Sequence, residues 1–296
     1  PDQIIHQTSS FQDFIQRGLG EILAEFSSIS DYTGDKLELR LLDYHFDEPE
    51  TSELESRVNN TTFEAALKIR AELINKATGE VKEAEIYMGQ YPWMTERGSF
   101  VINGAERVVV GQLVRSPGVM FSSSETPLGK KLYSAKINPV RGSWIEIESA
   151  ANGTISVKID KRRKIPLTTF LKAVGFSSNK EIQDTFKDVN TGDVDYLKET
   201  IKKDTTSTSS EALIEVFSRL RPGEMATVDN AKSLIEGILF NFKRFDLGKV
   251  GRYKMNRRLG LEGPFTPEGR ILRKEDLIAV IKELIRLNIS QEQADD

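Results

Sequence analysis

The chain has 296 residues, a formal net charge of −4 and no cysteine, which excludes disulfides and thiolate metal sites. A hydrophobic fraction of 38% and a charged fraction of 29% are typical of a globular protein with one large or two ordinary domains. The only two histidines, His6 and His45, argue against a histidine-built metal site or a Ser-His-Asp triad. Because no long apolar run or signal peptide is visible, we expect a cytoplasmic protein, and Pro1 in place of Met suggests a piece of a longer polypeptide.

The first predicted element is a helix over residues 9–26, where apolar side chains recur at helical spacing. Ser9 or Ser10 is available to cap it, and Gly18 and Gly20 weaken its middle. The apolar stripe predicts packing against a core, and a partner-binding helix is the alternative. Residues 36–41 then alternate polar and apolar side chains, which predicts a strand with one exposed face.

Residues 43–57 hold six acids against Arg57 and predict a solvated loop, with a docking site for a basic partner as the alternative. Residues 62–74 and 80–87 follow as two predicted strands joined by a short turn. The second strand alternates apolar and charged residues. Its charges are either a defence of an exposed sheet edge or part of an edge to which a partner adds a strand.

A meander of strands and turns is predicted over residues 86–121. Residues 99–102 and 108–110 are short runs rich in β-branched side chains, which favour strands. Asn103-Gly104 lies between them and is a strong hairpin signal, because both central residues of a type I′ turn need positive φ.

The second half of the chain predicts further strands followed by helices. Composition places a polar connection and a domain boundary at 121–130, and a variable low-complexity loop around one weak helix at 188–210. A hairpin turn is expected at Asn152-Gly153, and the Gly/Pro-rich residues 260–269 predict a loop. We predict strands at 131–138, 143–148 and 154–160, and helices at 167–174, 180–186, 210–220, 227–241 and 273–288.

Two basic clusters stand out. Residues 157–164 carry five basic side chains against Asp160, and residues 243–258 carry seven against Asp246. They either form solvated faces paired with acids elsewhere or bind phosphates. Trp144, on a predicted strand beside a turn, is either a core residue or an aromatic platform on which an unpaired base stacks.

The exact residue sequence of the central segment carries more information than its periodicity. MGQYPWMTERGSFVINGAERVVVGQLVRSPGV (88–119) resembles the signature near the amino end of the β subunit of bacterial-type DNA-directed RNA polymerase. Similar matches follow in the same order along the chain. They are KLYSAKINPVRGSWIEIE (131–148), VKIDKRRKIP (157–166), RLRPGEMATVDNAKSLIEGILF (219–240) and RFDLGKVGRYKMNRRL (244–259).

The resemblance implies an α+β fold in two parts. Residues 1–114 would be the first part of the β-rich protrusion domain, and residues 115–296 the mixed α/β lobe domain. In the polymerase family that the chain resembles, these two domains form one jaw of the DNA cleft. The partners implied are the other polymerase subunits (α, β′, ω and σ), DNA and transcription regulators, and no membrane. Catalytic magnesium is held by another subunit in this family, so this chain should have no cofactor, no metal site and no active site of its own.

The resemblance also assigns candidate binding residues. Trp144 would stack on an unpaired base of the non-template strand, and Arg115 would lie by the downstream base pocket. The upstream part of the same strand would be lined by Lys161, Arg163, Arg221 and Arg244. The edge strand would dock the transcription-repair coupling factor or similar regulators through Val81, Lys82 and Glu83. Part of the wall of the rifamycin pocket would be formed by Arg107, Val110 and Gln112, which in this chain alone favour the exposed face of a half-buried strand.

Two other function classes stay open. One is a protein-interaction module without direct DNA contact, in which the basic runs pair with acids and only the edge strand binds. The other is an independent enzyme with a carboxylate site, although the sequence does not show which of its 45 acidic residues converge. A salt series with single-stranded DNA separates the first of these from the DNA-contacting interpretation.

Overall fold

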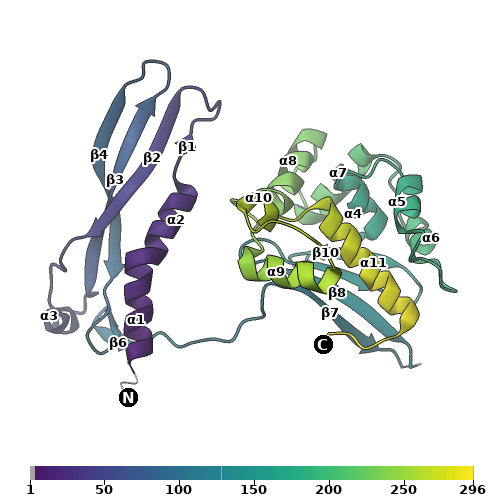
Figure 1. Ribbon diagram of the computed structural model, residues 1–296, viewed down its shortest axis with the longest axis horizontal. Helices are drawn as coiled ribbons and strands as arrows, with labels where there is room; N and C mark the ends of the chain where they lie inside the picture. Colours follow the sequence, from purple (N-terminus) through teal and green to yellow (C-terminus); the bar gives the residue numbers. More distant parts are fainter. Residues whose placement is uncertain (1–3, 128, 296) are drawn as a thin grey trace. The chain divides into compact units, whose positions relative to one another are not determined.

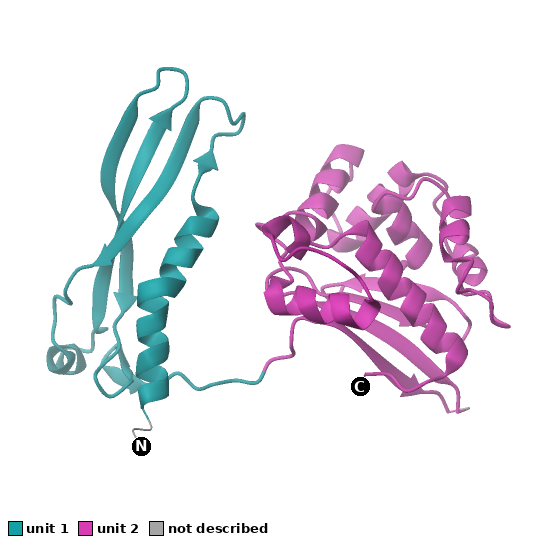
Figure 2. Cartoon of the chain, viewed as in Figure 1, with its two compact units in different colours: residues 1–113 teal, residues 114–296 magenta. Residues whose placement is uncertain are grey.

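The computed structural model describes residues 4–127 and 129–295, and the chain divides into two compact units, residues 1–113 and residues 114–296 (Figure 2). Both helices and antiparallel sheets are present, which confirms the predicted α+β class. The boundary predicted within 121–130 is wrong. Gly118–Glu125 is a strand, and the Thr126 amide donates to the Lys130 carbonyl (2.9 Å) to close the turn that follows it. Polar composition marked a hairpin end in that segment.

Unit 1 is a four-stranded antiparallel sheet in the order β1-β2-β3-β4 with a helical segment beside it (Figure 1). Leu23 of the helical segment packs on Leu67 and Ile69 of the sheet, and these three residues form the buried apolar cluster of the unit. Its elements are α1 Ile5–Asp13, the π-helical turn η1 Phe14–Gly18, α2 Leu19–Phe26, β1 Ile29–Ser30, β2 Leu37–Phe46, α3 Glu53–Val58, β3 Glu64–Asn75, β4 Val81–Pro92, β5 Phe100–Ile102 and β6 Ala105–Arg107.

The predicted first helix exists but begins earlier than expected. It starts at Ile5, so Ser9 and Ser10 lie inside α1 and neither is its N-cap. The widened π-helical turn of η1 ends at Gly18, in the middle that the glycines were expected to weaken. An added Cβ at Gly18 would lie 3.3 Å from the Phe14 ring, so the glycine relieves crowding in this turn.

Two loop or strand predictions in unit 1 are corrected by the structure. The acidic segment 43–57 includes the end of β2 and the short helix α3, which a capping box between Ser52 and Glu55 begins. The predicted strand at 108–110 is absent, because the β5–β6 hairpin ends at Arg107. The hairpin turn itself is confirmed, since Asn103 (φ 49°) and Gly104 (φ 77°) both have positive φ.

Unit 2 is a five-stranded antiparallel sheet in the order β11-β10-β9-β8-β7, with helices gathered on one face (Figure 1). Its strands are β7 Gly118–Glu125, β8 Lys131–Asn138, β9 Ile145–Ser149, β10 Ile155–Ile159 and β11 Ile165–Pro166. Its helices are α4 Leu167–Ala173, α5 Asn179–Phe186, α6 Tyr196–Ile201, α7 Ser209–Leu220, α8 Val228–Leu239, α9 Gly248–Leu259, α10 Pro267–Arg270 and α11 Lys274–Ser290. The predicted strand 131–138 is confirmed, whereas α9 lies in a basic segment for which no helix was predicted.

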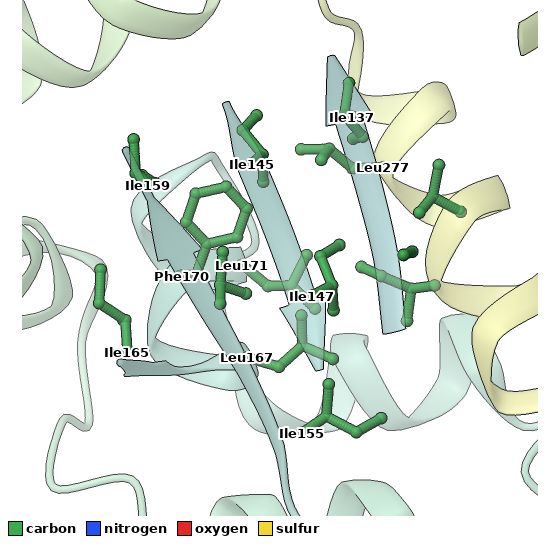
Figure 3. Packing of buried hydrophobic residues seen from close by; sticks show 14 of the residues in the cluster. Ile137, Ile145, Ile147, Ile155, Ile159, Ile165, Leu167, Phe170, Leu171 and Leu277 are labelled. Carbon is green, nitrogen blue, oxygen red and sulfur yellow. The ribbon is translucent and has the colours of Figure 1, made fainter. Parts of the chain in front are cut away.

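The core of unit 2 lies between the sheet and its helices. Alternate residues of β9 and β10, such as Ile147 and Val157, are fully buried, and Figure 3 shows Phe170 and Leu171 of α4 beside the sheet residues. The residues between them point to the opposite face, where Lys158 pairs with Glu148 (2.6 Å). The sheet therefore has one apolar face under helices and one charged face.

Segment 188–210 contains α6, which confirms the one weak helix predicted there, but it is not only a surface loop. The Asp204 side chain is fully buried beside Lys172 of α4 (2.9 Å). The Asp204 carboxylate accepts hydrogen bonds from Thr168, Thr169 and Thr206, so the low-complexity stretch fixes the start of α7 against α4. Within residues 4–127 and 129–295, no helix is long and apolar enough to span a bilayer.

Candidate nucleic-acid interface

Trp144, which was predicted to lie on a strand, comes directly before β9, and its backbone is fixed by the turn after β10. The side chain is 40% exposed, so Trp144 is not a core residue. The Asp160 amide donates to the Trp144 carbonyl (2.9 Å), and the Asp160 carboxylate accepts from the Trp144 amide (2.8 Å). Lys161 directly follows Asp160 and is exposed, so the turn places a cation next to the residue that is bonded to the Trp144 backbone.

The basic run continues from this turn to the end of α7. Arg163 is exposed, and the backbone carbonyl of Lys164 accepts a hydrogen bond from the Arg219 guanidinium. Arg219 is held by Glu215 one turn earlier in α7. This contact brings the 161–164 segment against the end of α7, two residues before Arg221.

Arg221 and Arg244 line one open pocket of about 640 Å³. Polar side chains of α8 and the loop after it, Asn230, Ser233 and Asn241, line the same pocket, together with the 85% exposed Met225. Arg221 pairs with Glu224 (3.2 Å), and both of these side chains are about half exposed. Two guanidinium groups distant in sequence therefore face one polar hollow.

The Arg244 segment also contacts the connection between β8 and β9, which carries Trp144. The amides of Val140 and Arg141 donate to the Asp246 carbonyl (2.8 and 3.2 Å), and the Arg141 guanidinium donates to the Phe242 carbonyl (2.9 Å). Gly142 (φ 120°) passes so close that an added Cβ would lie 2.7 Å from the Arg244 carbonyl oxygen. Only glycine fits this approach.

These contacts link the segments that carry five of the predicted residues, and we call this set of residues the basic track. It consists of Trp144, Lys161, Arg163, Arg221 and Arg244. The sixth predicted residue, Arg115, lies before β7 and donates to the Met120 sulfur (3.7 Å). β7 lies two strands from β9 in the sheet order, and the contact with Met120 stays within the β7 segment, so this contact does not link Arg115 to the track.

The electrostatics of the track favour an anionic ligand. Within the described residues, no carboxylate lies within ion-pair distance of Lys161, Arg163 or Arg244. The nearby Glu148 is occupied by Lys158 (2.6 Å) and Lys164 (3.0 Å). Burial raises the pKa of Glu148, but hydrogen bonds from these two lysines outweigh burial and lower it. The track therefore presents cations that the rest of unit 2 does not neutralise.

The predicted regulator edge is the outer strand of the sheet in unit 1. β4 pairs only with β3 in that sheet, and Val81 is 51% exposed. The Asn75 amide donates to the Glu80 carbonyl (2.8 Å) at the start of the ladder. Because antiparallel ladders alternate, the backbone groups of Val81 and Glu83 then point to the free edge, and Lys82 pairs inward.

Residues 115–296 match the family described as RNA polymerase Rpb2, domain 2. The chain belongs to this family. Relatives named DNA-directed RNA polymerase subunit beta include one from Geobacillus thermodenitrificans, 48% identical over 88% of this chain and 22% of the relative. Another, from Syntrophomonas wolfei, is 46% identical over 97% of this chain and 25% of the relative.

These relatives confirm the resemblance to the β subunit of bacterial-type RNA polymerase that the motifs indicated. The Rpb2 match begins at residue 115, next to the start of unit 2 at residue 114. The chain spans about a quarter or less of the length of the curated relatives that it matches.

In this Rpb2-family chain, sequence patterns did not identify some residues that support the site, and some predicted residues lie outside the basic track. Asp160, Arg141 and Arg219 support the track through backbone contacts, and only tertiary structure shows such contacts. Arg107 ends β6, whereas Val110 and Gln112 lie in an irregular exposed segment and not on a strand. Among the described residues, no three His, Asp or Glu side chains gather as metal ligands.

Proposed function

We propose that this chain works as part of the β subunit of a DNA-directed RNA polymerase, and that the basic track binds the displaced, non-template DNA strand. The observation that carries the proposal is that contacts link the segment of an exposed indole to those of Lys161, Arg163 and Arg244, which have no carboxylate partner within the described residues. Bases would stack on Trp144, while phosphates would lie on Lys161 and Arg163 and then on Arg221 and Arg244. A basic groove with an aromatic platform is how proteins hold unpaired strands without reading their sequence.

In the assembled enzyme this role is mechanical and electrostatic. The chain would form part of one jaw of the DNA cleft beside the α, β′, ω and σ subunits. Nucleotidyl transfer, with its magnesium ions, would take place on residues of another subunit. Arg115 would contact the strand further downstream, and the rifamycin-pocket assignment of Arg107, Val110 and Gln112 stays a prediction that needs residues from the rest of the subunit.

The test is a titration of the 296-residue chain with labelled oligo(dT) over a salt series. Neutralising four phosphates on a single strand predicts a slope of log affinity on log salt of about −3. Replacing Arg163 or Arg244 by Ala should reduce the slope by about 0.7 each. Trp144→Ala should weaken binding by roughly 1–3 kcal/mol with little change in slope.

The matched controls are Trp144→Phe, which retains an aromatic face, and Lys180→Ala, which removes an exposed lysine of α5. Trp144→Phe should keep most of the affinity, and Lys180→Ala should leave the slope unchanged. The absence of binding at low salt would contradict the proposal and favour a protein-interaction module. Equal losses of DNA affinity for Lys180→Ala and Arg163→Ala would show that binding depends on overall positive charge and not on the track.

A second function is favoured by the free edge of β4. We propose that a regulator, such as the transcription-repair coupling factor, adds a strand along Val81, Lys82 and Glu83. The outward backbone groups of Val81 and Glu83 supply the hydrogen bonds that strand addition requires. The long, exposed strand is also the kind of edge that a protein must either protect or use.

The substitution Glu83→Pro tests this docking because it removes an outward amide while leaving the inward ladder of Lys82 and Ala84 in place. Binding of the regulator's interaction domain, measured by calorimetry, should weaken at least tenfold (about 1.4 kcal/mol). Glu83→Ala, which keeps the amide, separates the backbone bond from the side-chain charge. Unchanged affinity in Glu83→Pro would rule out strand addition at this position.

A further inference from the structure

The turn that follows β10 has an unusual backbone. Asp160 (φ 48°) and Lys161 (φ 59°) are consecutive non-glycine residues in the left-handed region. This conformation costs an ordinary L-residue free energy, and Asp and Asn tolerate it best because their short side chains bond locally. Such strain persists where neighbouring contacts over-determine it.

The Arg162 amide closes this turn by donating to the Ile159 carbonyl (2.9 Å), and three further hydrogen bonds join the turn to the Trp144 segment. The two carboxylate oxygens of Asp160 accept from the Ser143 hydroxyl (2.6 Å) and from the Trp144 amide (2.8 Å). The Asp160 amide donates to the Trp144 carbonyl (2.9 Å). Asp160 therefore holds both backbone groups of Trp144 while its own φ directs Lys161.

Resting on the proposed function, we propose that Asp160 is a positioning residue of the single-strand site. Its carboxylate fixes the relative placement of the Trp144 ring and the Lys161 ammonium, so that a base and its neighbouring phosphate bind together. The carboxylate has no direct contact with the nucleic acid in this account. It acts through the backbone of the aromatic residue and through the turn.

This role predicts the opposite sign from simple electrostatics. An acid beside a cationic track repels phosphates, so removing its charge alone should tighten binding. We call the hydrogen bonds that the Asp160 side chain accepts from Ser143 and Trp144 the clamp. If Asp160 positions the site, a variant that loses both the charge and the clamp binds more weakly. A variant that loses the charge but keeps the clamp binds at least as tightly as the wild type.

Three substitutions separate these effects in the 296-residue chain with oligo(dT) as the probe. Asp160→Asn keeps an acceptor oxygen and tolerates positive φ, Asp160→Gly keeps only the φ, and Asp160→Ala keeps neither. We expect affinity equal to or up to about threefold tighter than wild type for Asn, and roughly three- to tenfold weaker for Gly and Ala. The rescue by Asn is the decisive result, because a residue needed only as a charge would not show it.

A second readout does not use DNA. In a Trp93→Phe background Trp144 is the only tryptophan, so its emission reports the clamp directly. Acrylamide quenching of Trp144 should increase in Asp160→Gly and Asp160→Ala and stay at the wild-type level in Asp160→Asn. Unchanged quenching in all three variants would overturn the inference.

The binding outcomes distinguish this inference from the function on which it rests. If the wild-type chain fails to bind oligo(dT) at low salt, the proposed function falls and the positioning role falls with it. If the wild type binds and Asp160→Gly and Asp160→Ala bind equally or more tightly, only the positioning role is overturned. Weaker binding of both with rescue by Asn supports both.

Discussion

The two units of this chain use the same architecture, an antiparallel sheet with helices on one face, but they bury very different amounts of apolar surface. Among the described residues of unit 1, the buried cluster consists of Leu23, Leu67 and Ile69, and Ile5 and Phe14 of the helical segment stay exposed. In unit 2 all strands and most helices contribute to one continuous core. Stability per residue rises with the fraction of surface buried, so unit 2 should be the more stable unit.

The difference bears on the two proposed binding surfaces. The basic track lies on turns and helix ends of the well-packed unit 2, and the proposed DNA binding would need a fixed geometry of ring and cations. The free edge of β4 lies in the thinly packed unit 1, and in the proposed docking a backbone ladder would supply the recognition. A rigid scaffold would be required for the first, whereas strand addition itself would order the second.

The largest effect that tests this comparison is expected from Lys172→Ala in unit 2. The substitution leaves Asp204 buried without its cation, and removing one partner of a buried pair typically costs about 3–5 kcal/mol. Hydrogen exchange should show loss of protection in unit 2 and none in unit 1. Lys202→Ala, which breaks the exposed pair with Glu199, should cost less than about 1 kcal/mol.

Equal loss of protection in both units would contradict the independence of their cores. A cost for Lys172→Ala no larger than that of the exposed control would show that the buried pair is unimportant for unit 2.

A smaller effect is expected from acid. Burial raises the pKa of Asp204, but hydrogen bonds from Thr168, Thr206 and Lys172 outweigh burial and lower it from 3.8 to about 2. The folded form therefore favours the ionised carboxylate. Ionised Asp204 stabilises the folded state by about 2 kcal/mol above pH 4, and this contribution is lost as the pH falls through 2. Asp204→Asn should remove this part of the acid dependence.

The measurement is the unfolding free energy of unit 2, obtained by urea denaturation at a series of pH values between 5 and 2. An Asp204→Asn variant with the same slope against pH as the wild type would show that other carboxylates control acid unfolding. The level of stability is not the criterion, because the variant also leaves Lys172 without its counter-charge.

Much of the fold followed from local pattern. The sequence pattern located β2, β3 and β4 of unit 1 and β8, β9 and β10 of unit 2 but not β1, β7 or β11, and Asn103-Gly104 located a hairpin. Where pattern failed, tertiary contacts were responsible. The segment 108–110 has the composition of a strand but pairs with no strand in the described part of the chain. The basic segment 248–259 did not predict a helix, yet it forms α9, in which Arg252 is fully buried against Asp276 (2.7 Å).

The candidate site divides in the same way. The basic residues and Trp144 are visible as types in the sequence, and their positions came from family motifs. Their convergence depends on Gly142 passing against Arg244, on Arg219 reaching the Lys164 carbonyl, and on Asp160 clamping Trp144. None of these contacts has a sequence signature, because each joins segments whose pairing only the folded chain determines.

The most direct test of the central claim is the emission of Trp144 in a Trp93→Phe chain during titration with oligo(dT). If bases stack on the exposed indole, quenching should saturate in step with binding measured by anisotropy of the labelled DNA. Added salt should then reverse both signals together. Binding by anisotropy with no change in Trp144 emission would contradict the account, because the strand would then be bound elsewhere on the chain.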